Sequence, residues 1–338
     1  MQISILTNIP GTPRSSFGHV LINSKLYVAG GHPGQFHVYK EANFSSEFHV
    51  YDITSSKWST LRSLPRSLQG FRMVSNGKYI YAFGGFSPDV RIVNGYWPAI
   101  SLDTVLRYSI IEDKWEEIGS MPHRRSSYVC QSIDNLVFLI GGWDATPSDL
   151  KDSKGRFIKA TDVFDLDTEK FVPSGLQFLD LRTRRAFTST KSGGRIIMAG
   201  GLGTEGMMAS DLFGEVISFT PPKASDVSSG SQTQGDWTLL PSLPYALFSP
   251  GIGALKNDLI VAGGVYPLVA QFQGITSSDI LIYRNGSTWW ESLPVKMSEA
   301  RSFVEVQELP GGKLLLIGGH HGIETDALPS NLIEVVQF

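Results

Sequence analysis

The sequence lacks the cysteines and the apolar segments that several protein classes require. Cys130 is its only cysteine, so neither an intrachain disulfide nor a cysteine-based zinc site can form. No apolar run approaches the roughly 20 residues that span a bilayer. The first residues also lack a basic region followed by an apolar core, as a signal peptide would have. We therefore expect a soluble cytoplasmic or nuclear protein with no membrane partner; a secreted protein whose signal peptide has been removed is the alternative.

An excess of charge of one sign is also absent. The 29 lysines and arginines nearly balance the 32 aspartates and glutamates, which leaves a net charge of −3. Nucleic acids and anionic membranes attract proteins mainly through concentrated positive charge. The sequence therefore predicts neither as a partner.

Glycine, in contrast, is in excess, and six Gly-Gly pairs explain much of it. The chain holds 35 glycines, whereas average usage would give roughly 24. The first glycines of the six pairs are residues 30, 84, 141, 200, 263 and 318, so the pairs recur every 54 to 63 residues along the whole chain. A repeat of this period predicts a propeller or a solenoid.

Each period carries the same further marks. An apolar run precedes the Gly-Gly pair, and a variable loop and a strand such as 48–52, 105–109 or 162–166 follow it. An aromatic residue and a Leu-Pro or Met-Pro pair end most of the periods. The aromatic residues are Trp58, Trp115, Phe171, Trp237 and either Trp289 or Trp290. Four short strands with glycine and aromatic punctuation are typical of a propeller blade.

These residues resemble the kelch-repeat family over essentially the whole chain. The resemblance implies an all-β, six-bladed kelch-type β-propeller in which the glycines and aromatic residues pack between blades and carry no chemistry. We expect one domain over residues 1–338 and a monomer. The expected blades are approximately 13–65, 66–122, 123–178, 179–244, 245–297, and 298–338 completed by 3–9. The N-terminal strand would thus close the last blade, which removes an open sheet edge, and no adaptor segment is left over.

One face of this propeller is expected to bind. If the four strands of a blade are called a to d from the axis outward, the a–b turns are short and the b–c connections are long. The b–c connections cover approximately 32–46, 86–103, 143–160, 202–213, 265–277 and 320–330. Long loops on a rigid scaffold are where binding residues concentrate. The b–c face is therefore the predicted binding face.

Arginines recur near the start of the first strand of most repeats. The candidates are Arg14, Arg66, Arg125, Arg185 and Arg301. The kelch resemblance places this position near the central opening on the b–c face, where converging guanidinium groups favour an anionic ligand or an acidic peptide. The alternative is that some of them join blades structurally. The fifth repeat has residues 245–248 (YALF) there, so one side of the opening should be apolar.

The residues that follow the Gly-Gly pairs are expected to face the same opening. The candidates are His32, Phe86, Trp143, Tyr266 and His320. Aromatic and imidazole side chains beside arginines suit a small molecule or a peptide. His32 and His320 belong to neighbouring blades and should approach each other. The spacing forces no third ligand, although Glu324 or Asp326 could serve, so we predict neither a metal nor another cofactor.

Two functions from different classes remain open. The first is a recognition module that binds a protein segment or an acidic peptide on the b–c face. The alternative is a small-molecule enzyme or binder in the central cavity that acts on an anionic or sugar-like ligand, as in the bacterial kelch-like sialic acid mutarotases. Glu205 and Arg185 are the weak candidates for an acid–base pair in that case. The identity of the ligand stays open.

Overall fold

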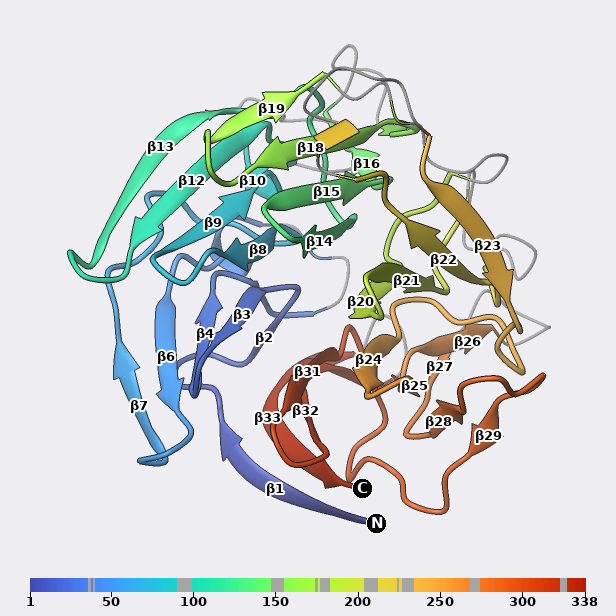
Figure 1. The fold of residues 1–338 in the computed structure, drawn as a ribbon. Coiled ribbons are helices and arrows are strands. Elements are labelled where there is room, and N and C mark those ends of the chain that lie inside the picture. The colour runs from blue at the N-terminus through green and yellow to red at the C-terminus, as the bar shows by residue number, and fades with distance from the viewer. Residues whose placement is uncertain are drawn as a thin grey trace.

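The structure is a computed structural model of the whole chain (Figure 1). It describes residues 1–338 except 36–37, 39, 90–98, 147–154, 174–175, 177–182, 204–211, 224, 227–233, 268–273 and 323–326. Six twisted antiparallel sheets surround a central axis, which confirms the predicted all-β, six-bladed propeller. None of the helices found in the described residues is long and apolar enough to cross a membrane.

Each blade is one sheet of four strands. Blade 1 contains β3 (Gly18–Ile22), β4 (Lys25–Ala29), β6 (Phe48–Asp52) and β7 (Lys57–Thr60). Blade 2 contains β8 (Arg72–Ser75), β9 (Tyr79–Phe83), β12 (Thr104–Ser109) and β13 (Lys114–Ser120). Blade 3 contains β14 (Val129–Ile133), β15 (Leu136–Ile140), β18 (Thr161–Asp165) and β19 (Lys170–Val172).

The second half of the ring repeats the arrangement. Blade 4 contains β20 (Thr188–Ser192), β21 (Arg195–Ala199), β22 (Val216–Thr220) and β23 (Asp236–Leu240). Blade 5 contains β24 (Gly251–Leu255), β25 (Asp258–Ala262), β28 (Ile280–Tyr283) and β29 (Glu291–Ser292). Blade 6 contains β31 (Glu305–Leu309), β32 (Lys313–His321), β33 (Leu328–Gln337) and β1 (Gln2–Asn8).

Short pairs of strands extend the blades on the b–c face. They are β2 (Arg14–Ser15) with β5 (His32–Pro33), β10 (Phe86–Pro88) with β11 (Ala99–Ser101), β16 (Trp143–Asp144) with β17 (Arg156–Phe157), β26 (Val265–Pro267) with β27 (Gly274–Thr276), and β30 (Arg301–Ser302) with β32. A single 3-10 turn, η1 (Glu41–Asn43), lies in the first b–c connection.

The N-terminal strand closes the ring as predicted. β1 pairs antiparallel with β33 from Gln2 opposite Gln337 to Asn8 opposite Leu332. The two chain ends therefore lie side by side (Figure 1). The last blade is built from both ends of the chain, and its sheet is complete only when the whole ring has formed.

The Gly-Gly pairs lie where backbone meets backbone. Gly142, directly after β15, has a φ of +91°, which favours glycine. A Cβ atom on Gly142 would lie 2.5 Å from Cβ of Tyr128 and 2.8 Å from the carbonyl oxygen of Ser126. The pair is thus a packing device, as the sequence predicted.

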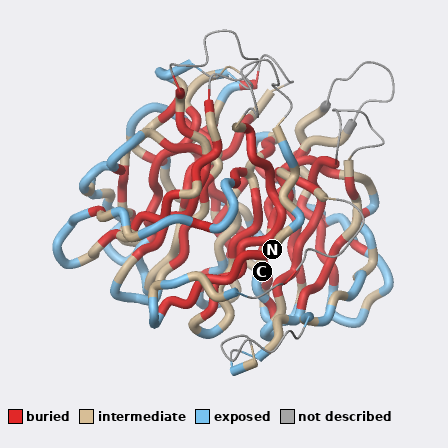
Figure 2. Tube along the Cα trace, turned by 90° about the horizontal axis from the view of Figure 1, so that it is seen from above, coloured by how far each residue is buried: buried red, intermediate tan, exposed pale blue. Residues whose placement is uncertain are grey.

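The aromatic residues of the outer strands fill the space between blades. The indole N–H of Trp115 in blade 2 donates to the carbonyl oxygen of Arg62 after blade 1, at 2.9 Å. Trp290 in blade 5 donates in the same way to Pro241 after blade 4, at 2.8 Å. The buried residues run through the sheets, and exposed residues gather at the turns (Figure 2). The core is therefore a series of layers between neighbouring blades.

Candidate functional site

Main-chain atoms of all six blades meet at the axis, near the b–c face. The residues that meet there, here called the axial ring, are Ser16, Gly70, Ser127, Ala186, Ser249 and Phe303, and all six have φ between 47° and 62°. Five N–H···O=C bonds of 2.7–3.0 Å link successive members from Ser16 to Phe303. This chain of bonds fixes the inner ends of the blades relative to one another.

Just outside the axial ring lies a ring of larger side chains. In each repeat the residue before the axial ring pairs with the residue after the Gly-Gly pair, as Ser15 does with His32 and Arg185 with Leu202. Six side chains from these pairs, together with Phe303 of the axial ring, are here called the mouth ring: His32, Phe86, Trp143, Arg185, Phe248, His320 and Phe303. It lies at the b–c end of the axis, which is the predicted binding face.

A cation and two aromatic rings occupy one side of the mouth ring. The guanidinium carbon of Arg185 lies 4.2 Å from the ring centre of Trp143. Trp143 in turn packs edge to face against Phe86, with ring centres 5.9 Å apart. Arg185 and Phe86 are half-buried, and Trp143 is buried. A guanidinium packed over an indole face directs its N–H groups outward in its own plane, where they can donate to an anionic group.

Two histidines occupy the opposite side. The rings of His32 and His320 have centres 5.9 Å apart, so the predicted approach of these residues is confirmed. His32 Nε2 lies 2.9 Å from the carbonyl oxygen of Gln35, and the side-chain amide of Gln69 lies 3.1 Å from His32 Nδ1. The imidazole therefore donates through Nε2 and accepts through Nδ1, as a neutral ring does. Burial also lowers the pKa of His32, so the structure favours the neutral form.

The fifth blade makes the ring apolar, as the sequence predicted. Phe248 packs with Ala186 and Leu202, and half-buried Phe303 lies against this cluster. Tyr266, in contrast, contacts Tyr245, with ring centres 5.7 Å apart, and packs against the core cluster of blades 4 and 5 and not against Phe248 or Phe303. Neither Phe248 nor Phe303 was singled out as a site residue from the sequence, although counting back from the next Gly-Gly pair would have identified both.

Three of the predicted arginines lie inside the blades. Arg14, Arg125 and Arg301 are fully buried. Each donates to the carbonyl oxygen of the first glycine of its own Gly-Gly pair, namely Gly30, Gly141 and Gly318. Each also pairs with a carboxylate: Glu47, Asp162 and Glu334, respectively. This geometry gives them a structural task, the stabilisation of the Gly-Gly turn, and leaves them no surface from which to contact a ligand.

The same geometry separates the two arginines of the fourth repeat. Arg184, not Arg185, donates to the first glycine of its pair, Gly200, at 3.1 Å. It stands 16 residues before that glycine, as do Arg14 and Arg125 before theirs. In repeats 2 and 5 the equivalent residues are Leu68 and Leu247. The constant spacing was present in the sequence and would have assigned Arg184 to the interior and Arg185 to the mouth ring.

Arg66 does not occupy the equivalent position of the second repeat, which is Leu68. Its side chain is 45% exposed and lies 4.0 Å from a carboxylate oxygen of Glu117. Such an exposed pair contributes little to stability. Glu205, the candidate acid–base residue, lies outside the described residues, as do Glu324 and Asp326. Among the residues with described positions, no three histidine, cysteine, aspartate or glutamate side chains gather as a metal site would require.

A hollow lies at the other end of the axis. The innermost strands β3, β8, β14, β20, β24 and β31 surround a cavity of about 450 Å³, here called the vestibule. Asn23 and Gly77, at two a–b turns, line it, so it opens on the face opposite the mouth ring. The repeat pattern predicted no role for this face.

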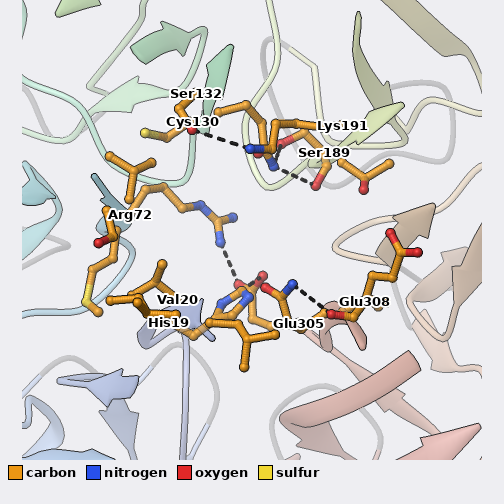
Figure 3. Close-up of a pocket in the computed structure, with 18 of the residues that line it drawn as sticks. His19, Val20, Arg72, Cys130, Ser132, Ser189, Lys191, Glu305 and Glu308 are labelled. Atoms are coloured by element: carbon orange, nitrogen blue, oxygen red, sulfur yellow. Dashed lines mark hydrogen bonds and ion pairs between the residues drawn. The ribbon is translucent and has the colours of Figure 1, made fainter. Parts of the chain in front are cut away.

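An ion pair crosses the axis at the inner end of the vestibule. Arg72 of blade 2 donates through Nη1 to Glu305 of blade 6, at 2.5 Å, and through Nε to the carbonyl oxygen of Tyr128, at 2.9 Å (Figure 3). Both charged residues also line the smaller space beside the axial ring. They therefore form a crossbar between the vestibule and the mouth ring. Since the two residues are 233 positions apart, no local pattern could have linked them.

A comparison with protein families identifies the repeat. A family model described as "Kelch motif" matches residues 13–65 and 68–122, which are the first two repeats. The other four repeats form blades of the same strand order. The chain belongs to the kelch-repeat family.

Curated relatives of this kelch-repeat chain match it over a part of its length. "Kelch domain-containing protein 10" of Homo sapiens is 28% identical over 137 residues, which are 37% of this chain and 28% of that protein. "N-(sulfonatooxy)prop-2-enimidothioate sulfolyase" of Thlaspi arvense is 30% identical over 134 residues, or 38% of this chain and 36% of the relative. The matches thus span only about a third of these relatives.

A solved structure matches the whole propeller. The structure titled "Structure of YjhT" superposes with a TM-score of 0.74 and covers 96% of this chain and 97% of that one. The sequences are 15% identical. This likeness shows the shared fold and no more.

Proposed function

We propose that this kelch propeller is a protein-recognition module whose mouth ring binds an extended protein segment that carries an acidic side chain. The observation that carries the proposal is the half-buried guanidinium of Arg185 held over Trp143 at the centre of the b–c face. A carboxylate can pair with this guanidinium, and the aromatic and apolar members of the ring can pack against neighbouring side chains. Kelch propellers in general serve as interaction modules, which supports the same reading.

The burial of Arg14, Arg125 and Arg301 limits how acidic the bound segment should be. A ring of converging guanidinium groups would favour a highly acidic ligand, but these three are used inside the blades. One guanidinium beside an apolar arc suits a segment with a single acidic residue among apolar ones. Interface anchors are commonly arginine, tryptophan and tyrosine, and the mouth ring presents the first two together.

The enzyme alternative has less support. It needed Arg125, Arg185, Glu205 and Tyr266 to line one pocket. Arg125 is fully buried in blade 3, and Glu205 lies outside the described residues. We therefore do not propose an acid–base mechanism for this chain.

Replacement of Arg185 by alanine is expected to weaken the binding of selected peptides at least tenfold, because a charge-assisted hydrogen bond contributes about 1.5–3 kcal/mol. A displayed library of random 12-residue peptides would be selected on the immobilised protein and the affinities measured by fluorescence polarisation. Selected peptides should be enriched in aspartate or glutamate flanked by apolar residues.

The matched control is Arg195→Ala, which removes a half-buried arginine at the a–b turn of the same blade. It should leave the affinity unchanged. Peptides without acidic enrichment, or peptides that bind the wild type and Arg185→Ala equally, would contradict the proposal.

A further inference from the structure

The vestibule has the dimensions and lining of a small-molecule site. Its volume of about 450 Å³ falls within the usual range of ligand pockets, about 300–1,000 Å³. The crossbar of Arg72 and Glu305 lies at its inner end, so the axis is not an open tube between the two faces. A ligand that enters from the a–b face would therefore meet a polar floor.

Two charged side chains in the vestibule remain without an ionic partner among the described residues. Lys191 of β20 donates only a long hydrogen bond, 3.4 Å, to the hydroxyl of Ser132. Glu308 of β31 forms no ion pair with any described residue either, and a hydrogen bond from the main chain of Lys256 favours its charged form. Arg72 and Glu305, in contrast, neutralise each other. The vestibule thus has one unmatched cation and one unmatched anion.

The strand between these two charges is apolar. β24 lies between β20 and β31 in the inner ring. Its sequence, GIGAL, has no polar side chain, and its contribution to the vestibule lining is Ile252. Figure 3 shows Lys191 and Ser189 on one side of the hollow and Glu305 and Glu308 on the other. Ile252 itself is only 1% exposed and packs in the core, so β24 presents little side-chain surface to the hollow. The niche over β24 therefore has a positive end and a negative end, with no charged side chain from β24 between them.

The electrostatic environment of both groups favours a partner of opposite charge. Burial lowers the pKa of Lys191, although its side chain faces the open hollow. Burial also raises the pKa of Glu308. Both residues are nevertheless exposed, so they stand on the open wall of the hollow and not in its core. In each case desolvation disfavours the charged form, and a bound counter-charge would restore it.

We propose that the vestibule binds a small zwitterion, an aminocarboxylate whose carboxylate meets Lys191, whose ammonium meets Glu308 and whose hydrocarbon chain spans the uncharged strand β24 between them. Hydroxyl and amide groups from Ser132, Ser189 and Gln131 line the cationic end and can complete the hydrogen bonds of the carboxylate. The ligand has no net charge, in keeping with the balanced charges of the lining. This site is separate from the mouth ring and independent of the peptide proposed there.

Isothermal titration calorimetry with 4-aminobutanoate, 5-aminopentanoate and 6-aminohexanoate tests the proposal. At least one member should bind, and the corresponding alkanoate and alkylamine, which each lack one charge, should bind at least tenfold more weakly. Lys191→Gln and Glu308→Gln should each weaken binding at least tenfold. The exchanged variant with Lys191→Glu and Glu308→Lys should recover part of the affinity, because it restores both charges in reversed order.

The matched controls keep the outcome clear. Lys25→Gln, at another a–b turn and outside the vestibule lining, should bind as the wild type does. Arg185→Ala should also bind the zwitterion normally, which separates this site from the mouth ring. Thermal midpoints within a degree of the wild type would show that the variants are folded.

The proposal is overturned if no member of the series binds the wild-type protein. It is also overturned if a neutral polyol such as sorbitol binds as tightly, or if both single variants bind unchanged. Loss of peptide binding in Arg185→Ala with no zwitterion binding in the wild type would reject the vestibule site alone and leave the mouth ring proposal standing.

Discussion

Arg125→Ala is expected to lower the free energy of unfolding by about 3 kcal/mol, because it removes the buried cation of the Asp162 carboxylate and leaves only the exposed imidazole of His123 beside it. The Arg125 side chain is fully buried and Asp162 is 6% exposed, with 2.5 Å between Nη2 and Oδ2. The same guanidinium donates to the carbonyl oxygens of Leu139 and Gly141, both at 3.0 Å. Those two acceptors would lose their partner as well, which adds the cost of buried unsatisfied groups.

The neighbouring arginine provides a matched control. Arg124 is 48% exposed and lies 3.5 Å from an Asp103 oxygen, so Arg124→Ala should cost no more than about 1 kcal/mol. Urea denaturation followed by tryptophan fluorescence measures both. Equal losses for the two variants would show that the buried arginines are not the structural device inferred from their contacts. The buried pair of Arg301 and Glu334 in blade 6 should behave as Arg125 and Asp162 do.

The second large effect concerns the Gly-Gly turns. Gly142→Ala is expected to cost about 2–5 kcal/mol, the sum of a left-handed φ for a residue with a side chain, about 1–2 kcal/mol, and overpacking, about 1–3 kcal/mol. The added Cβ would meet Tyr128 and the main chain of Ser126. These residues directly precede β14, and the Gly-Gly turn packs against them. Neither group is the far end of a flexible side chain, so relief requires the backbone to move.

A glycine with similar dihedral angle but no neighbours isolates the packing contribution. Gly77, at an a–b turn, has a φ of +88°, and a Cβ there would meet nothing within 4 Å. Gly77→Ala should therefore cost only the conformational part, about 1–2 kcal/mol. Equal shifts of the urea midpoint for the two variants would contradict this prediction. The close approach at Gly142 would then contribute nothing to stability, and only the dihedral angles would explain why glycine recurs at this position in the six repeats.

Residue spacing allowed the propeller to be predicted in full. Six Gly-Gly pairs in register indicated six blades, and the Ile-Pro after residues 3–8 indicated that the N-terminal strand completes the last one, as its pairing with β33 confirms. The approach of His32 and His320 followed from the same register. Each of these features depends on a repeated local pattern, and such patterns can be read without knowing how distant segments meet.

The direction of each arginine depends on a register that is exact to one residue. Side chains alternate along a strand, so a shift of one residue, from Arg184 to Arg185, exchanges the blade interior for the mouth ring. The vestibule could not be predicted from the sequence. Arg72, Lys191 and Glu308 come from blades 2, 4 and 6, and closure of the ring brings them to one hollow.

By itself, then, the sequence determined the number of blades, their order and their packing residues, because these repeat at a fixed period. The tertiary structure decided which charged groups lie inside the blades and which line the mouth ring or the vestibule, because burial and pairing depend on contacts between segments far apart in the chain. The six Gly-Gly turns belong to the first kind. The crossbar of Arg72 and Glu305, which divides the axis into two ends, belongs to the second.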